Sequence, residues 1–160
     1  MSIQVGEKMP SGVFGVMTDA GPGAMSTEEL FAGKKVVLVS VPGAFTPTCS
    51  ASHLPGFVNH AGELLAKGVD TIACMSVNDV FVMNAWGENQ KVADKVMMLA
   101  DGNGEYARAL DLEMDGTAFG MGKRSQRFAI IADDGTATHV AVEAPGQFEV
   151  SKAESVMANL

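Results

Sequence analysis

The sequence predicts an α/β fold in which helices flank a central mixed β-sheet. In the first part of the chain, apolar runs of strand length alternate with stretches whose apolar residues recur at helical spacing, an order typical of parallel strands joined by helices. Near the C-terminus, two strand-like runs flank Asp134-Gly135, a hairpin turn signal that adds antiparallel pairing. At 160 residues, the chain is expected to form one domain over residues 1–160.

The N-terminal elements lead to one strongly apolar strand. A short strand is predicted at Val13–Thr18, followed by a loop at Ala20–Gly23. Ser26–Leu30 has the cap residue and early acidic residues of a short helix. Val36–Ser40 is β-branched and aliphatic, which is the composition of a strand buried on both faces of a parallel sheet.

A helix from Cys49 to about Lys67 is predicted after this strand. Thr46 and Pro47 are a pairing expected at a helix start, because a Thr hydroxyl can cap free backbone N–H groups and Pro fits the first helical position. Pro55 lies inside the predicted helix and should kink it or fray its start, because Pro removes one backbone donor.

The rest of the chain continues the alternation of strands and helices. The helix after Asp79 is predicted because Val82, Ala85 and Trp86 recur at helical spacing. The predicted elements are a strand at Thr71–Val77, a helix over Asp79–Lys91, a strand at Lys95–Ala100, a turn at Asp101–Glu105 leading into a short helix through Leu110, strands at Arg127–Ala132 and Ala137–Val142, and a closing helix over Ser151–Asn159. This order is what a thioredoxin-like α/β sandwich would produce.

Cys49 is the candidate nucleophile. It falls in the first turn of the predicted helix, where free N–H groups and the helix dipole favour a thiolate. An unperturbed cysteine, with a pKa of about 8.5, is only a few per cent thiolate at pH 7. Because a helix terminus typically contributes only about 0.3–1 kcal/mol, a nearby permanent cation is also expected. Arg127, at the start of a predicted strand, is one candidate for that cation.

A family resemblance rests on four blocks of residues. Pro42–Cys49, PGAFTPTC, resembles the Pro-x-x-x-Thr-x-x-Cys signature of peroxiredoxins. This sequence, together with Ser50 and His53–Gly56 (HLPG) after it, is similar to the corresponding sequence of the peroxiredoxin V (plant type II) subfamily. The later similar blocks are Ser76–Asp79, Phe81–Met83 with Ala85-Trp86, and Arg124–Phe128. The resemblance covers nearly the whole chain and implies the same thioredoxin-like fold.

The resemblance implies a thiol peroxidase that reduces hydrogen peroxide and alkyl hydroperoxides. Cys49 would attack the peroxide as a thiolate and become a sulfenic acid, which another thiol must reduce. Arg127 would be the active-site arginine, with Arg124 as the second candidate. The Thr46 hydroxyl would contact the thiolate and the peroxide, and Pro42 would shield the pocket from water.

A different class of function stays open at this point. In a redox-sensing or chaperone-like binding protein, oxidation of Cys49 would shift a partner interface without turnover. Catalytic consumption of peroxide with a dithiol reductant distinguishes the peroxidase from a sensor that is oxidised once, stoichiometrically.

Regeneration of Cys49 is expected to follow a one-cysteine mechanism. Some animal members of the family carry a resolving cysteine near the C-terminus, where this chain has Ser151 and no Cys in Gln147–Lys152. Cys74, in the centre of a predicted strand, could form a disulfide with Cys49 only if their Cα atoms came within about 7 Å. We therefore expect Cys74 to be mainly structural, a resolving role through local unfolding being the alternative. Glutathione would attack the sulfenic acid, and glutaredoxin or thioredoxin would clear the mixed disulfide; no bound cofactor is expected.

Two kinds of metal site are excluded on residue spacing. Asp101–Glu113 is acidic like a calcium loop but has Tyr106 and Leu112 where an EF-hand needs Gly and Glu. Cys49 and His53 share a helix face, yet the other candidate ligands stand at no customary zinc spacing; these are Cys74, His60 and His139. To form a hydrolase dyad His53 would have to reach back a full turn. It is expected to be a partly exposed polar residue or a local hydrogen-bond partner.

The net charge of −8 argues against nucleic acid or anionic lipid as a partner, because both are bound through Lys and Arg stripes. The first residues, MSIQVGEKMP, lack the apolar core of a signal peptide. No apolar run approaches the roughly 20 residues of a membrane span. We therefore expect a cytoplasmic protein without a membrane partner.

The resemblance further implies a homodimer that packs around the Cys49 loop. Phe45, Phe81 and Phe119 are its predicted apolar contacts. Phe45 lies in the turn between Pro42 and Cys49, where a large exposed ring is costly unless something covers it. Burial of the ring within one chain is the alternative.

Overall fold

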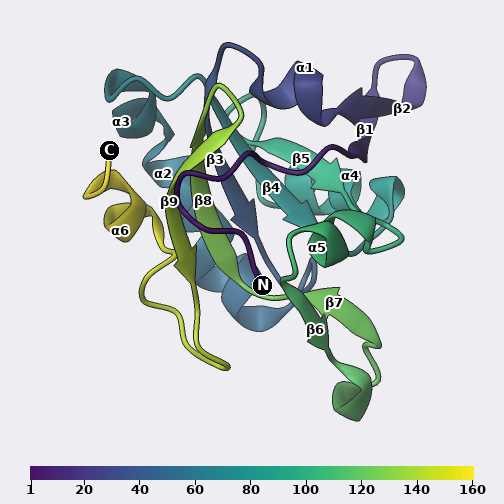
Figure 1. Cartoon of the computed structure of the whole chain (residues 1–160). Helices are drawn as coiled ribbons and strands as arrows, with labels where there is room; N and C mark the ends of the chain where they lie inside the picture. The colour runs from purple at the N-terminus through teal and green to yellow at the C-terminus, as the bar shows by residue number, and fades with distance from the viewer.

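The computed structural model describes residues 1–160, in which strands and helices alternate (Figure 1). The strands are β1 (Val13–Thr18), β2 (Gly21–Ser26), β3 (Lys35–Ser40), β4 (Thr71–Ser76), β5 (Met97–Ala100), β6 (Glu113–Asp115), β7 (Lys123–Ser125), β8 (Phe128–Asp133) and β9 (Thr136–Val142). The helices are α1 (Thr27–Phe31), α2 (Leu54–Asn59), α3 (Ala61–Ala66), α4 (Val80–Asn89), α5 (Glu105–Ala109) and α6 (Ala153–Met157), with a π-helical turn at Cys49–His53 and a 3₁₀ turn at Thr117–Phe119.

Seven of the strands form one sheet in the order β2-β1-β5-β4-β3-β8-β9, and β6 and β7 form a separate hairpin. β3 pairs in parallel with β4, and β4 in parallel with β5, whereas the other neighbours in the large sheet are antiparallel. The predicted central mixed sheet flanked by helices is confirmed. None of the helices combines the length and the hydropathy needed to cross a lipid bilayer.

β3 is apolar on both faces because both faces are covered. Val37 and Val39 pack in an apolar cluster with residues of α2, α4 and α6, whereas Val36 and Leu38 pack in a second cluster with residues of α1 and α5. All four side chains are buried. Full burial of each such side chain contributes about 1.5–3 kcal/mol, so the strand that leads to Cys49 is firmly held.

The sheet topology brings three segments together at one end of the central strands. The parallel strands β3 and β4 both end there, so the Cys49 loop and the turn after β4 leave the sheet side by side. β8 runs antiparallel to β3, with Phe128 paired to Ser40. Arg127, one residue before Phe128, therefore lies at the same end of the sheet, where the Cys49 loop begins.

The predicted cap at the start of α1 and the predicted hairpin turn are confirmed, and the structure adds a cap at the start of α4. Ser26 caps α1 in a reciprocal capping box with Glu29, and Asp79 caps α4 by accepting from the backbone N–H of Val82 at 2.9 Å. Asp134 and Gly135 have positive φ angles of 49° and 80°, as expected for the predicted turn between β8 and β9.

The predicted loop at Ala20–Gly23 is wrong, because Gly21–Ser26 is strand β2. This strand pairs with β1 only and forms one edge of the sheet. Pro22 and the neighbouring glycines obscure the strand in the sequence, but an edge strand tolerates them because only one side needs ladder hydrogen bonds.

The predicted helix from Cys49 to Lys67 is interrupted twice. Its first part widens into the π-helical turn Cys49–His53, in which Leu54 N–H donates to the Cys49 carbonyl. Pro55 follows directly and has no N–H to continue an α-helical ladder. A second break, at His60, separates α2 from α3.

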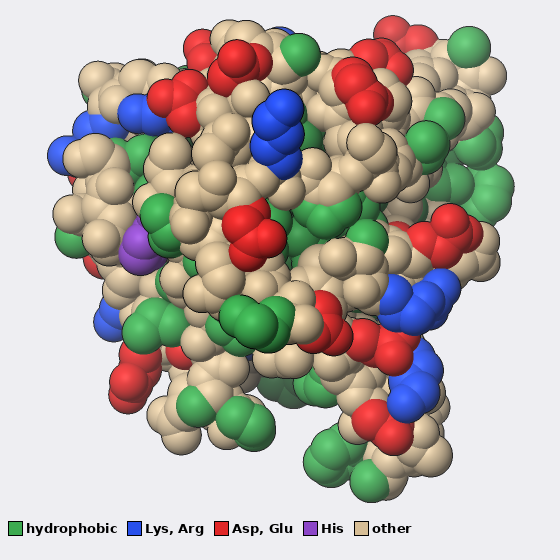
Figure 2. Space-filling model, in the orientation of Figure 1, with side chains coloured by type: hydrophobic (Ala, Val, Ile, Leu, Met, Phe, Trp, Pro, Cys, Tyr) green, Lys and Arg blue, Asp and Glu red, His purple; other side chains and the backbone are tan.

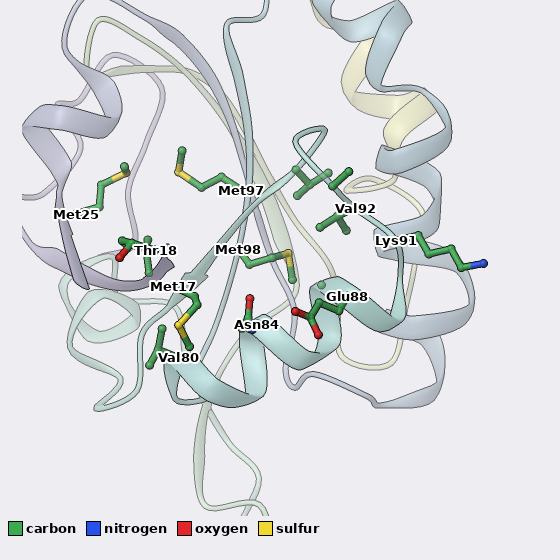
Figure 3. Close-up of a pocket in the computed structure, with 14 residues that line it drawn as sticks. Met17, Thr18, Met25, Val80, Asn84, Glu88, Lys91, Val92, Met97 and Met98 are labelled. Carbon is green, nitrogen blue, oxygen red and sulfur yellow. The ribbon is translucent and has the colours of Figure 1, made fainter. Parts of the chain in front are cut away.

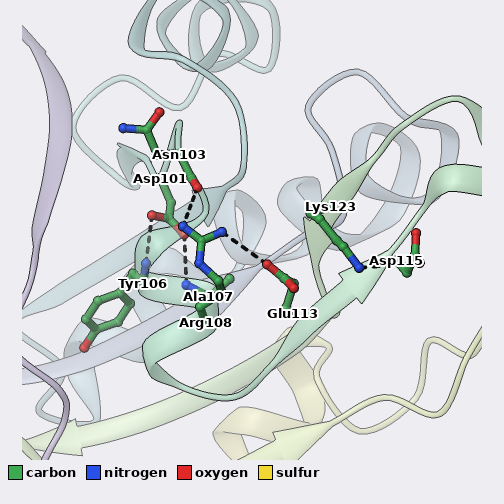
Figure 4. Close-up of polar contacts among 8 residues, drawn as sticks. All are labelled: Asp101, Asn103, Tyr106, Ala107, Arg108, Glu113, Asp115 and Lys123. Carbon is green, nitrogen blue, oxygen red and sulfur yellow. Dashed lines mark hydrogen bonds and ion pairs between the residues drawn. The ribbon is translucent and has the colours of Figure 1, made fainter.

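The β6–β7 hairpin is absent from the sequence prediction, and Figure 1 shows it projecting from the body of the chain. Polar contacts tie its base to α5 (Figure 4). Arg108 donates to the Asn103 carbonyl at 2.9 Å and to Glu113 at 3.2 Å, and Lys123 lies 3.5 Å from Asp115 within the hairpin. The acidic residues that resemble a calcium loop thus contact protein donors.

Asp101 is a buried acidic residue in the turn before α5. Its carboxylate accepts from the backbone N–H of Tyr106 at 3.0 Å and of Ala107 at 2.9 Å, and so caps α5 (Figure 4). Two orphan helix donors are satisfied by one buried acid.

Replacing Asp101 should therefore cost more stability than replacing an exposed cap. We expect Asp101→Ala to lower the free energy of unfolding by about 2–4 kcal/mol, because two N–H groups lose their acceptor in a buried place. The matched variant Asp79→Ala removes a single exposed cap bond and should cost about 1 kcal/mol. Urea titration measures both, and equal losses would contradict the special role of Asp101.

Candidate active site

Cys49 begins the π-helical turn, and its side chain is fully buried. Its Sγ lies 2.8 Å from the Thr46 hydroxyl and 3.0 Å from Nη2 of Arg127. A neighbouring residue of the same loop, Thr46, and a residue 78 positions away, Arg127, thus contact one sulfur. Such hydrogen bonds favour the charged form of a buried group, so the arrangement suits a thiolate.

The Thr46 hydroxyl has a different role from the predicted helix cap. It lies 2.8 Å from the Gly43 carbonyl and 2.8 Å from Cys49 Sγ. A hydroxyl has one proton, so it can donate to the carbonyl while a thiol donates to it, or donate to a thiolate instead. The Thr46 hydroxyl can therefore hydrogen-bond to Cys49 in either protonation state of the sulfur.

Of the two candidate arginines, Arg127 reaches the sulfur. Arg124 contacts the backbone of the Cys49 loop instead, with Nη1 3.4 Å from the Pro42 carbonyl and Nε 2.9 Å from the Met121 carbonyl. A Cβ at Gly43 would meet Arg124 Nη1 at 3.0 Å, so a larger residue there would displace the guanidinium from the loop. Arg124 thus supports the loop from the β7 side.

A cavity of about 380 Å³ opens beside these residues. Pro42, Thr48 and Arg127 line it near Cys49, and Phe148 and Glu143 line it on the side of the C-terminal segment. The Arg127 guanidinium carbon lies 5.8 Å from the centre of the Phe148 ring. The cavity provides space for a small organic group beside Arg127, whose guanidinium contacts Cys49 Sγ.

The expectation that His53 is partly exposed is wrong, because its side chain is fully buried. Its Nδ1 lies 2.8 Å from Nη1 of Arg127, and its Nε2 lies 3.0 Å from the Ser151 carbonyl. Burial, and secondly the charge of Arg127, lower the pKa of His53 to about 4. The i, i+4 spacing from Cys49 places both side chains on one helix face, but it gives no sign of the contact with Arg127.

Cys74 lies in the centre of β4, between Val39 and Met98 on the neighbouring strands. Both cysteines are free and buried, and they belong to the same apolar cluster. Burial, with the negative charge of Cys49 as a second cause, raises the pKa of the Cys74 thiol well above its ordinary value. This is the environment of a structural cysteine.

The predicted dimer contacts are all solvent-exposed: Phe45 by 52%, Phe81 by 63% and Phe119 by 82%. Phe45 has a positive φ of 65°, which is unfavourable for a bulky residue. The exposure of Phe45 excludes burial of its ring within one chain. Hydrophobic side chains also cluster at the end of the projecting β6–β7 hairpin (Figure 2).

A second, larger cavity lies away from Cys49. It has a volume of about 650 Å³ between α4, β1 and β5, and its lining contains no cysteine, histidine or arginine. Figure 3 shows Met17, Met25, Met97 and Met98 along it. These methionines line the cavity with flexible apolar side chains, which are commonly found where elements pack irregularly.

Residues 4–157 match the family model described as Redoxin. The chain is 48% identical over 161 residues to peroxiredoxin-2E, chloroplastic, of Arabidopsis thaliana, covering 98% of this chain and 68% of that protein. It is 47% identical to peroxiredoxin-2B of the same plant, covering 97% and 96%. The crystal structure of reduced Prx3 from Vibrio vulnificus in complex with hydrogen peroxide superposes with a TM-score of 0.94 at 53% identity, covering 98% of each chain.

These matches extend over nearly the full chain, and the relatives are named peroxiredoxins. The buried Cys49 with its two donors lies in a thioredoxin-like fold, and that fold is the one predicted from the sequence. The chain therefore belongs to the peroxiredoxins of the Redoxin family and is a thiol-dependent peroxidase.

Proposed function

We propose that this peroxidase reduces hydrogen peroxide and small alkyl hydroperoxides at Cys49 by a one-cysteine cycle. The observation that carries the proposal is the meeting of Thr46 Oγ1 and Arg127 Nη2 on a buried sulfur. The thiolate attacks the terminal peroxide oxygen, the O–O bond breaks, and Cys49 becomes a sulfenic acid. The departing alkoxide or hydroxide takes up a proton. Arg127 and Thr46 stabilise the charge that moves from sulfur to oxygen.

The cavity beside Cys49 supports organic as well as inorganic peroxides. Its volume of about 380 Å³ is far larger than a hydrogen peroxide molecule requires. Apolar groups of Pro42, Met114, Pro145 and Phe148 line part of it. An alkyl group could contact these side chains while the peroxide oxygens contact Arg127 and Thr46.

The Cys49 and Arg127 variants test the assignment of the site. Cys49→Ser should abolish peroxide consumption. Arg127→Gln should slow the reaction by about 10²- to 10³-fold, as expected when one charge-stabilising donor is removed, and should move thiolate formation to higher pH. Stopped-flow kinetics and an ultraviolet thiolate titration measure the two effects.

Arg124→Gln is the matched control, because Arg124 contacts the same loop but not the sulfur. We expect a loss below about tenfold for this variant, or about 1.4 kcal/mol. If Arg124→Gln loses more activity than Arg127→Gln, the assignment of the arginine is overturned.

The electron donor in the proposed cycle is an external thiol, glutathione with glutaredoxin or thioredoxin, and no bound cofactor takes part. The position of Cys74 in the centre of β4, between the paired strands β3 and β5, supports this cycle, because a thiol held in the middle of the sheet is poorly placed to resolve Cys49. We also propose that the protein works in the cytoplasm, where such donors keep thiols reduced.

Cys74→Ser should therefore keep full turnover in assays with either donor system. Intact mass after one equivalent of peroxide should show one added oxygen, or one glutathione when that thiol is present. A Cys49–Cys74 disulfide in the wild type, together with lost turnover in the variant, would instead make Cys74 the resolving thiol.

A homodimer that packs around the Cys49 loop is the second part of the proposal. Phe45 is adjacent to Trp86 of α4, with ring centres 6.5 Å apart, and Phe81 belongs to the same helix. The strained φ of Phe45 holds a large ring in solvent, a cost that burial against a second copy would offset.

Light scattering should give the mass of a dimer at micromolar concentration. Phe45→Ser combined with Phe81→Ser should shift the protein toward monomer. Leu65→Ser is the control, because Leu65 is equally exposed, by 52%, but lies on α3. A wild-type protein that is monomeric throughout would refute the dimer.

A further inference from the structure

The hydrogen bonds of His53 define its proton. The Ser151 carbonyl can only accept, so Nε2 of His53 must carry the proton and donate to it over 3.0 Å. In the neutral ring, Nδ1 then has a free lone pair and accepts from Arg127 Nη1 over 2.8 Å. His53 is thus bound on one side to the C-terminal segment and on the other to the arginine.

His53 remains neutral at physiological pH. Burial and the adjacent Arg127 charge lower its pKa to about 4, against weaker opposing effects of the hydrogen bond to Ser151 and of the Glu143 charge. Phe57 and Phe148 enclose the ring, with centroid distances of 5.7 and 5.0 Å. A neutral imidazole is therefore available to accept a hydrogen bond from the guanidinium.

Arg127 is held at two points of its planar group. Nη1 donates to His53 and Nη2 donates to Cys49 Sγ, at 2.8 and 3.0 Å. Without the first contact, the long side chain would have to order itself for each reaction, at a cost in rotamer entropy. With it, the guanidinium is already oriented before peroxide arrives.

The C-terminal segment that accepts from His53 is itself fixed by Glu143. The Glu143 carboxylate accepts from the backbone N–H of Ser151 at 2.9 Å, from the Ser151 hydroxyl at 2.6 Å and from the backbone N–H of Glu149 at 2.8 Å. Burial alone would raise the pKa of Glu143, but these hydrogen bonds outweigh it and lower the pKa. A charged acid therefore holds the Ser151 carbonyl in place.

We propose that His53 is a positioning residue that holds the Arg127 guanidinium against Cys49, and that Glu143 holds His53 in turn through Ser151. The series connects the segment after β9 to the reacting sulfur through hydrogen bonds of 3.0 Å or less. His53 itself does not contact Cys49 Sγ by a hydrogen bond, so its effect on the reaction passes through Arg127.

Two replacements of His53 separate positioning from a purely structural role. His53→Asn places an amide oxygen near the position of Nδ1 and can still accept from Arg127, whereas His53→Leu fills the apolar space but accepts nothing. We expect His53→Leu to slow sulfenic acid formation by about 10- to 100-fold and His53→Asn by less than about tenfold. Their stabilities should follow the opposite order, because Leu suits a buried site better than Asn.

If His53 had only a structural role, the more stable variant should also be the more active one. A His53→Leu variant that is more stable but slower than His53→Asn would therefore indicate positioning. His60→Gln is the control, since His60 binds Glu63 and Glu154 away from the site, and it should react like the wild type. If folded His53→Leu reacts within twofold of the wild type, or if both His53 variants are equally slow, the proposal is overturned.

The outer part of the series is tested by a double-mutant cycle. Glu143→Gln should slow the wild-type reaction but cause no further loss in the His53→Leu background, because Glu143 acts through His53. Losses that simply multiply would show that Glu143 acts by another route and would refute this part of the proposal.

Nitrogen NMR of the wild-type imidazole keeps the proposal testable even if a variant does not fold. The expected signature at pH 7 is a neutral His53 ring protonated at Nε2. A ring protonated at Nδ1, or an imidazolium, could not accept from Arg127 and would overturn the proposal.

The pH dependence of stability supplies a further check. Because the folded-state pKa of His53, about 4, lies below the ordinary 6.5, the unfolded chain binds more protons between these values. The contribution of neutral His53 to stability is therefore present above pH 6.5 and is lost as the pH falls toward 4. Arg127, Glu143 and Cys49 are the charged or titratable groups around the ring. His53→Asn should flatten this part of the stability curve; an unchanged slope would contradict a buried neutral His53.

Discussion

A sulfur inside an apolar cluster is stabilised as a thiolate only when hydrogen-bond donors reach it, and this requirement organises the site. Cys49 lies in the same buried cluster as Val37 and Val39 of β3. A charge in such a place is costly unless it is paired. The pairing comes from Thr46 in the adjoining loop and from Arg127, which reaches the sulfur because β8 lies antiparallel to β3 in a register that pairs Phe128 with Ser40. The contact between Arg127 and Cys49 therefore depends on the register of the sheet.

Much of the fold could be predicted because its signals are local. β3, the capping box of α1 and the Asp134-Gly135 turn each depend on a few neighbouring residues, and the structure has all three. β2 could not be found in this way, because Pro22 and its glycines have no strand character. It is a strand only because β1 supplies a partner on one side.

The same division applies to the site. The Pro-x-x-x-Thr-x-x-Cys stretch identifies Cys49 and Thr46, and the later block identifies Arg127, but each of these predictions concerns contact with the sulfur. The contacts behind Arg127 are long-range and leave no local pattern. His53 meets Arg127 across 74 positions of the sequence and Ser151 across 98. Only the folded chain places them together.

The two cysteines show what burial alone does to a thiol. Both are fully buried in one cluster, yet Cys49 receives two polar donors at its sulfur, whereas Cys74 is surrounded by β3 and β5 and makes no comparable contact. Burial, reinforced by the negative charge of Cys49, raises the pKa of Cys74 and keeps it a thiol. Since a thiol is a poor nucleophile, this shift keeps Cys74 unreactive. The two sulfurs therefore differ in which one the Arg127 guanidinium reaches, and the β3–β8 register directs it to Cys49.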